Sequence, residues 1–166
     1  PFYSKEILME IVEEIRKVKP GIVVSNWGGS MHKDHVMAYK IVKEAVFLSE
    51  NRNIKTKSPA HRVSSLYFME NWEDNNNFRP NVYIDTEGFM EEWETIVNKY
   101  DLVKNSISKF PYVDYYKALS IVRGSEVGFK NAQAFQTEEN FDFKLCVSKG
   151  FDKSFYVDNY LLKQID

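Results

Sequence analysis

The chain has 166 residues, enough for one domain with a sizeable core. Hydrophobic residues make up 43% of it and charged residues 28%, a composition typical of a soluble globular protein. The net charge is −2 without a basic block, which excludes the electrostatic footprint of a nucleic-acid binder. No apolar run approaches the roughly 20 residues that a membrane span needs. The single Cys146 cannot form an internal disulfide, so we expect a reducing, cytoplasmic location. A homo-oligomer is compatible with the sequence.

The first element along the chain is a predicted helix. Ser4 can cap it, and apolar residues recur at helical spacing from Ile7 to Val18. The charged residues between them, Arg16 among them, are expected to form a solvated face. Residues 19–21, Lys-Pro-Gly, end the helix, and the apolar run 22–25 predicts a short buried strand. A helix that feeds such a strand is half of a βαβ unit, which favours an α/β fold.

A loop with two glycines, residues 26–31, follows the strand and leads into a helix that opens with His32-Lys33-Asp34-His35. In open α/β sheets, ligands bind outside the carboxyl ends of the strands, so this loop is a candidate site. No repeat or linker interrupts the chain, which predicts one domain over residues 1–166. The remaining expectations are strands at 64–69, 82–84, 132–135 and 154–157, a helix capped by Asp85 or Thr86, a helix from 115 to about 127, and a short helix from Asp158.

The tetrad His32-Lys33-Asp34-His35 carries the chemistry. Two histidines three residues apart at a helix start share a face, so both can point into one pocket. Neutral imidazole is a good zinc ligand, and an adjacent carboxylate can fix its tautomer. The pair can also divide the work, with one histidine on the metal while the other, held by Asp34, exchanges protons. A surface cluster of capping residues is the alternative.

The chain offers too few residues for the complete ligand set of a catalytic zinc ion. A catalytic zinc normally takes about three protein ligands and a water. The third histidine of the chain, His61, lies in a loop beside Arg62 and is expected to be no ligand. Either carboxylates elsewhere complete the site, or the other ligands belong to a segment outside the chain.

Several blocks in the right order resemble the PIG-L/LmbE-like family of N-acetylglucosaminyl deacetylases. The tetrad is similar to the H-P-D-H stretch of that family, and the final block is similar to its R-G-x-x-x-G…A-E-A-F. The blocks that carry the resemblance are residues 16–24, 32–35, 66–72, 79–85, 123–128 and 131–135.

The resemblance implies a Rossmann-like three-layer α/β sandwich with a mostly parallel sheet, and hydrolysis of an acetamide on an amino sugar. His35 would ligate zinc or another divalent metal, His32 would protonate the leaving amine or stabilise the oxyanion, and Asp34 would support His32. The other ligands and the general base of the family lie in an H-P-D-D segment, which this chain lacks. With the start at Pro1, this predicts an incomplete domain, the C-terminal part of such a deacetylase, not competent alone.

The sequence departs from the family pattern in places. Lys33 replaces the usual proline, Gln133 stands where the family has glutamate, and Ser30 sits where some members place an oxyanion-stabilising tyrosine. A non-catalytic sugar-binding or scaffold protein is the alternative function. The candidates for contact with a small amino-sugar substrate are Trp27, Asn71, Trp72 and Arg123. Packing roles for the tryptophans, a turn for Asn71 and an ion pair for Arg123 are the competing interpretations.

Overall fold

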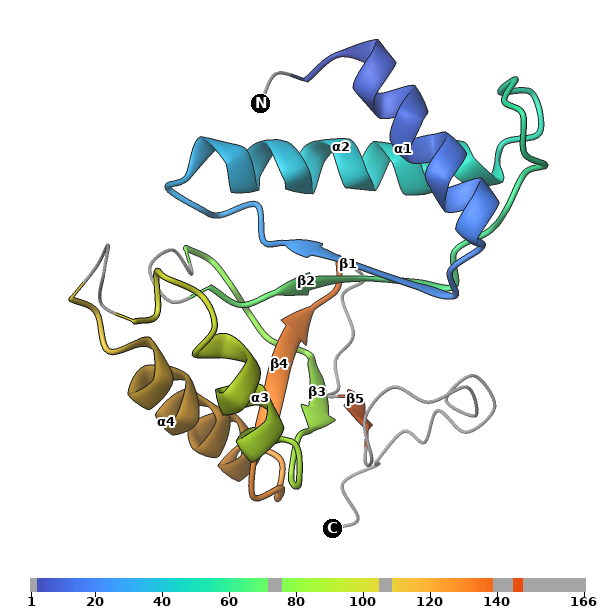
Figure 1. Cartoon of the computed structure of the whole chain (residues 1–166). Helices are drawn as coiled ribbons and strands as arrows, with labels where there is room; N and C mark the ends of the chain where they lie inside the picture. Colours follow the sequence, from blue (N-terminus) through green and yellow to red (C-terminus); the bar gives the residue numbers. More distant parts are fainter. Residues whose placement is uncertain (1–2, 72–75, 105–108, 139–144, 148–166) are drawn as a thin grey trace, which may run out of the picture. The chain divides into compact units, whose positions relative to one another are not determined.

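The structure is a computed structural model that describes residues 3–71, 76–104, 109–138 and 145–147 (Figure 1). The chain divides into two compact units, Pro1–Arg79 with Phe135–Glu138, and Pro80–Ala134 with Glu139–Asp166. The α/β class is confirmed, and the single domain stays a prediction. The elements are α1 (Lys5–Val18), β1 (Ile22–Asn26), α2 (Lys33–Glu50), β2 (Ser65–Met69), β3 (Val82–Asp85), α3 (Met90–Val97), α4 (Tyr112–Ser125), β4 (Ala132–Gln136) and β5 (Leu145–Val147).

Helix α1 begins and ends where local chemistry predicts. The Ser4 hydroxyl accepts a hydrogen bond from the Ile7 amide at 3.2 Å, which satisfies one of the free N–H groups of the first turn. Lys19 adopts a left-handed conformation with φ 54°, and its amide donates to the Ile15 carbonyl at 2.8 Å. Both predicted boundaries are confirmed.

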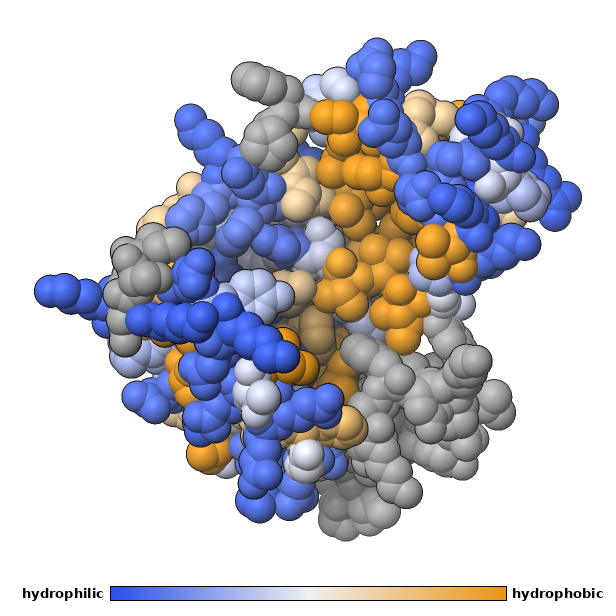
Figure 2. Space-filling view, in the orientation of Figure 1, coloured by the Kyte–Doolittle hydropathy of each residue, from blue (hydrophilic) through white to orange (hydrophobic). Residues whose placement is uncertain are grey.

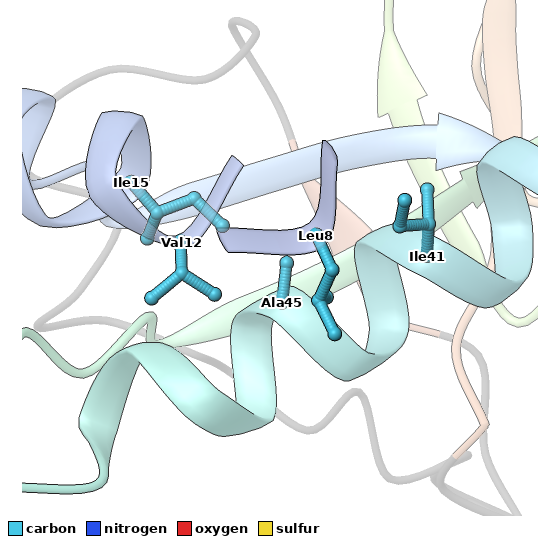
Figure 3. Packing of buried hydrophobic residues seen from close by; sticks show 5 residues of the cluster. All are labelled: Leu8, Val12, Ile15, Ile41 and Ala45. Carbon is cyan, nitrogen blue, oxygen red and sulfur yellow. The ribbon is translucent and has the colours of Figure 1, made fainter. Parts of the chain in front are cut away.

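The core of the first unit lies between α1 and α2. Leu8, Val12 and Ile15 of α1 pack against Ile41 and Ala45 of α2, and Figure 3 shows these five side chains meeting between the two helices. All five are buried. The helical spacing of the apolar residues, predicted from the sequence, therefore produces this contact.

Arg16 departs from the predicted solvated face, because its side chain is only 2% exposed. Its guanidinium donates to four main-chain carbonyls at and beyond the end of α2, at 2.7–3.2 Å, and to the Thr56 hydroxyl. The carbonyls belong to Leu48, Ser49, Asn51 and Ile54. The last turn of α2 has no basic residue of its own. Arg16 supplies from α1 the positive charge and the donors that a helix C-terminus favours.

The sheet of the first unit is mixed. β1 and β2 are parallel, with Val24 opposite Tyr67, and β2 pairs antiparallel with the end of β4, with Phe68 opposite Gln136. The order is β1-β2-β4, so β1 is terminal. Figure 1 shows α1 and α2 on the same side of β1 and β2. The predicted burial of the first strand is incomplete, since Val24 is 40% exposed.

In the second unit, β3 pairs parallel with β5, a strand that the sequence did not predict. Two predicted helix starts are wrong. α3 begins at Met90 because the Asp85 carboxylate accepts from the Glu87 amide and Thr86 forms a turn with Phe89, so neither caps a helix. α4 begins at Tyr112 rather than at residue 115. The predicted strand 154–157 and the helix from residue 158 lie outside the described residues.

No helix within the described ranges is long and apolar enough to cross a membrane.

Candidate functional site

The candidate site lies where β1 ends and α2 begins. β1 closes at Asn26, and six residues later His32 takes the N-cap position of α2 with an extended backbone, φ −79° and ψ 115°. The His32 carbonyl accepts from the amides of His35 and Val36 at 3.0 and 3.2 Å. Asp34 lies in the first turn, where its negative charge complements the helix dipole. The fold thus places the tetrad at the carboxyl end of a parallel strand.

The two histidines of the tetrad lie side by side, as their spacing predicts. Their ring centroids are 5.1 Å apart, with an angle of 59° between the planes. His35 is half-buried, while His32 and Asp34 are exposed. His35 is therefore the more buried of the two imidazoles, which is compatible with two different roles.

The Nδ1 atom of His35 has two polar neighbours from different elements. The Ser30 hydroxyl, in the glycine loop, lies 3.2 Å from it, and the Asn71 amide nitrogen lies at the same distance. Asn71 follows the end of β2, so the β1–β2 pairing brings it to His35. The Ser30 oxygen also accepts from the His32 amide at 3.0 Å. Ser30 thus links both histidines.

These two neighbours favour different tautomers of His35. The Asn71 amide donates, so it favours the tautomer whose Nδ1 is bare. A hydroxyl can donate or accept, so Ser30 can also hold the tautomer whose Nδ1 carries the proton. In that second tautomer, Nε2 presents its lone pair to a ligand. Ser30 is therefore the neighbour that fits a His35 that binds through Nε2.

Trp27 anchors the loop that carries Ser30. Its indole nitrogen donates to the Asn76 carbonyl at 2.9 Å. Its ring makes edge contacts with Tyr39, Phe68 and Phe78, at centroid distances of 5.7–6.1 Å. These contacts account for Trp27 as a packed, half-buried residue, and its contact with a sugar stays a prediction.

Gly29 is required by the close approach of Asn76. A Cβ at position 29 would lie 2.1 Å from the Asn76 carbonyl oxygen and 2.5 Å from the Trp27 indole nitrogen. We expect Gly29→Ala to break the Trp27–Asn76 hydrogen bond and to lower the free energy of unfolding by about 1–3 kcal/mol, as overpacking does. Urea unfolding followed by circular dichroism measures the loss. An unchanged midpoint would show that the loop adapts freely.

Tyr39 and Lys43 of α2 share the Glu138 carboxylate on the same unit. Lys43 lies 2.6 Å from Glu138, and the Tyr39 hydroxyl donates to it. Burial raises the pKa of Tyr39, and the hydrogen bond to Glu138 raises it further. The same carboxylate raises the pKa of Lys43. Tyr39 therefore keeps its proton at neutral pH and packs as a neutral ring against Trp27.

The other predicted residues have different surroundings. Arg123, on α4, pairs with Glu126 at 2.7 Å, and Glu126 also accepts from the Tyr83 hydroxyl at 2.7 Å. His61 Nε2 lies 2.8 Å from the Pro20 carbonyl oxygen, so it donates to it. Trp72 lies outside the described residues.

The donors at the site suit a metal in kind but do not complete a ligand set. Imidazole is a preferred zinc ligand. Within the part of the chain that the structure describes, however, no three His, Cys, Asp or Glu side chains are grouped to hold a metal ion. A metal at His35 would need further ligands from elsewhere.

Two residues stand out only in the structure, Ser30 by its contacts with both histidines and Glu70 by its burial. The sequence left the role of Ser30 unassigned, although a hydroxyl two residues before a helix-opening histidine is a usable signal. Glu70 is 5% exposed, directly before Asn71. An acidic residue right after a predicted buried strand is the signal that could have singled it out.

Known structures show the same fold. The chain matches a conserved protein from Thermus thermophilus, TT1542, with a TM-score of 0.71 and 23% identity over 84% of this chain and 61% of that one. It matches the 4-carboxy-2-hydroxymuconate hydratase GalB from Pseudomonas putida KT2440 with a TM-score of 0.65 and 16% identity over 84% and 63%. It matches an N,N'-diacetylchitobiose deacetylase from Pyrococcus horikoshii with a TM-score of 0.59 and 16% identity over 81% and 52%.

No family model matches the sequence. The chain spans between 52% and 63% of the length of these three solved structures. Identities this low show the fold alone. The chain therefore has the α/β fold that this hydratase and this deacetylase share.

Proposed function

We propose that the chain is part of a metal-dependent hydrolase that removes the acetyl group from an N-acetylated amino sugar. The observation that carries the proposal is the histidine pair at the end of β1, with ring centroids 5.1 Å apart and His35 Nδ1 beside Ser30 and Asn71. The fold likeness to a deacetylase supports the reaction class. We also propose that the whole domain is a Rossmann-like three-layer sandwich.

In this proposal His35 is one ligand of a zinc or similar divalent ion, and the other ligands come from outside the described residues. The ion would supply Lewis acidity toward the acetyl carbonyl and the attacking water. His35 suits the ligand role because it is half-buried and its Nδ1 lies 3.2 Å from the Ser30 hydroxyl, which can hold the tautomer that leaves Nε2 bare.

His32 suits the proton-transfer role. It is exposed at the helix start, where its ring can reach a bound substrate, and Asp34 follows two residues later in the same turn. When the C–N bond of the acetamide breaks, the departing nitrogen needs a proton, and an imidazolium is a suitable acid near neutral pH. His32 would deliver that proton.

The full-length protein tests the proposal directly. We expect it to contain a divalent metal and to release acetate from at least one N-acetylhexosamine conjugate in a panel, with metal measured by mass spectrometry. A metal-free, inactive full-length protein that still binds the sugars would favour the non-catalytic alternative.

We expect Ser30→Ala to weaken metal binding by about 10-fold, because loss of a group that orients a ligating histidine typically costs 10–100-fold in affinity. Ser30→Thr keeps a hydroxyl and should retain most of the affinity. Ser125→Ala removes a hydroxyl that binds the Ile121 carbonyl on α4 and is the control. Competition with a zinc chelator gives the affinities. Equal affinities for the two alanine variants would contradict the role of Ser30.

A further inference from the structure

The outward side of α2 carries residues at the spacing of a surface on which two helices pair. The buried residues of α2 lie on the other side of the helix. The outward residues follow one another at intervals of four and three, and they are Lys33, Met37, Lys40, Glu44 and Phe47. Met37 is half-buried and the other four are exposed. Positions so spaced form one stripe along a helix, as in helices that pack lengthwise on each other. We call these five residues the outward stripe.

Phe47 gives the outward stripe an exposed aromatic ring. Its side chain is 65% exposed, and it borders a hollow that Tyr39, Lys40, Lys43 and Glu44 also line. Apolar surface occurs elsewhere on the same unit, since Figure 2 shows it, in orange at the centre of the view, over α1 and β1. The outward stripe differs from that surface because it also carries charges in a definite order along the helix.

The charges of the outward stripe are opposite to those that α2 itself favours. Lys33 and Lys40 lie in the N-terminal half of the helix, Glu44 lies in the C-terminal half, and Glu50 is the last residue. The helix dipole favours acidic groups at the N-terminus and basic groups at the C-terminus. A lysine four residues before a glutamate is also the less favourable orientation within one helix. The order is instead complementary to a second helix that runs in the opposite direction.

The outward stripe is symmetric about one level of the helix. Residue 42 lies midway between Lys40 and Glu44, and also midway between Met37 and Phe47. A two-fold axis at this level brings Lys40 of each copy to Glu44 of the other, and Met37 of each copy to Phe47 of the other. The first contact is an ion pair, and the second joins a thioether to an aromatic ring, which is favourable. Each side chain therefore meets a complementary one in a second copy.

We propose that the outward stripe of α2 is the interface between two copies of this chain, with their α2 helices antiparallel about a two-fold axis near residue 42. α2 has 18 residues and is therefore about 27 Å long. At the ends of this length, Lys33 of one copy comes near Glu50 of the other. A single pair of helices is smaller than a standard interface, so we expect the association to be reversible and to depend on concentration.

Sedimentation equilibrium of the full-length protein tests the interface. We expect an even-numbered assembly, a dimer in the simplest case. Lys40→Glu and Glu44→Lys should each raise the Kd of the association at least about 10-fold, because each places two like-charged pairs across the two-fold axis. An equimolar mixture of the two variants should associate as tightly as the wild type. In the mixture, one copy presents only acidic and the other only basic side chains at these two positions.

Phe47→Ser should also raise the Kd at least about 10-fold, because it removes apolar surface that the second copy would bury. Phe89→Ser, at a phenylalanine 53% exposed in the second unit, is the matched control. Lys104→Glu, at a lysine 53% exposed in the same unit, is the control for the charge reversals. Both controls should leave the Kd unchanged, and circular dichroism verifies that every variant is folded.

Three outcomes would overturn the proposal. A wild-type protein that is monomeric at every concentration would assign the outward stripe to a different occupant. Charge reversals that leave the Kd unchanged would place the interface elsewhere on the protein. A mixture of folded Lys40→Glu and Glu44→Lys variants that does not associate would show that these two residues do not meet across the interface.

Discussion

Arg16→Met is expected to lower the free energy of unfolding by about 3 kcal/mol, because it removes a charged group that donates hydrogen bonds to four main-chain carbonyls and to the Thr56 hydroxyl. Hydrogen bonds from a charged group contribute about 1.5–3 kcal/mol each, and the guanidinium donates to four carbonyls around the end of α2. Three of these carbonyls keep a main-chain partner after the change, since Leu48, Ser49 and Asn51 also accept from the amides of Asn51, His61 and Ile54. Water can reach some of them after the change, so the full sum is not expected.

A buried charge also costs free energy of desolvation, so its replacement by an apolar side chain sometimes leaves the stability of a protein unchanged or raises it. That occurs when both partners of an ion pair are replaced together. Here the partners are main-chain carbonyls, which no substitution removes, and the last turn of α2 has no basic residue of its own. The loss of hydrogen bonds and of the dipole interaction therefore outweighs the relief from desolvation.

Lys17→Met is the matched control for Arg16→Met. Lys17 is the next residue of α1, and its side chain, 65% exposed, pairs with Glu14 at 3.2 Å. Exposed pairs of this kind contribute less than about 1 kcal/mol. Arg16→Lys should resemble Arg16→Met, since one ammonium cannot reach all the carbonyls. Urea unfolding of the three variants gives the values, and similar losses for Arg16→Met and Lys17→Met would refute the capping role.

His32→Ala in the complete protein is expected to reduce turnover by roughly 10²–10⁴-fold and to leave the metal content unchanged. That range is typical for loss of a general acid. His35→Ala should instead lose the metal, because the Ser30 hydroxyl beside Nδ1 of His35 can hold the tautomer that offers Nε2 to the ion. Acetate release and metal content of each variant are measured together.

His61→Ala is the control for both variants, since His61 lies against the Pro20 carbonyl and has no place in the proposed chemistry. It should keep metal and turnover. Metal loss in His32→Ala, with metal retained in His35→Ala, would reverse the two assignments.

The sequence predicted elements well where a local signal sets them. The N-cap at Ser4 and the paired rings of His32 and His35 depend on residues three apart, and both appear as expected. The start of α3 was wrong because Asp85 uses its carboxylate in a turn rather than in a cap. β5 was missed because a strand of three residues depends on pairing with distant β3.

The sequence by itself determined the α/β class, the helix–strand–helix order around the tetrad, and the shared face of its histidines, because spacing along a few residues sets each of these. Only the tertiary structure decided that Arg16 is buried and that Asn71 meets His35. The guanidinium binds carbonyls at least 32 residues away, and Asn71 lies 36 residues from His35. Such contacts arise from helix packing and strand pairing, which bring distant polar groups together and which no periodicity in the sequence records.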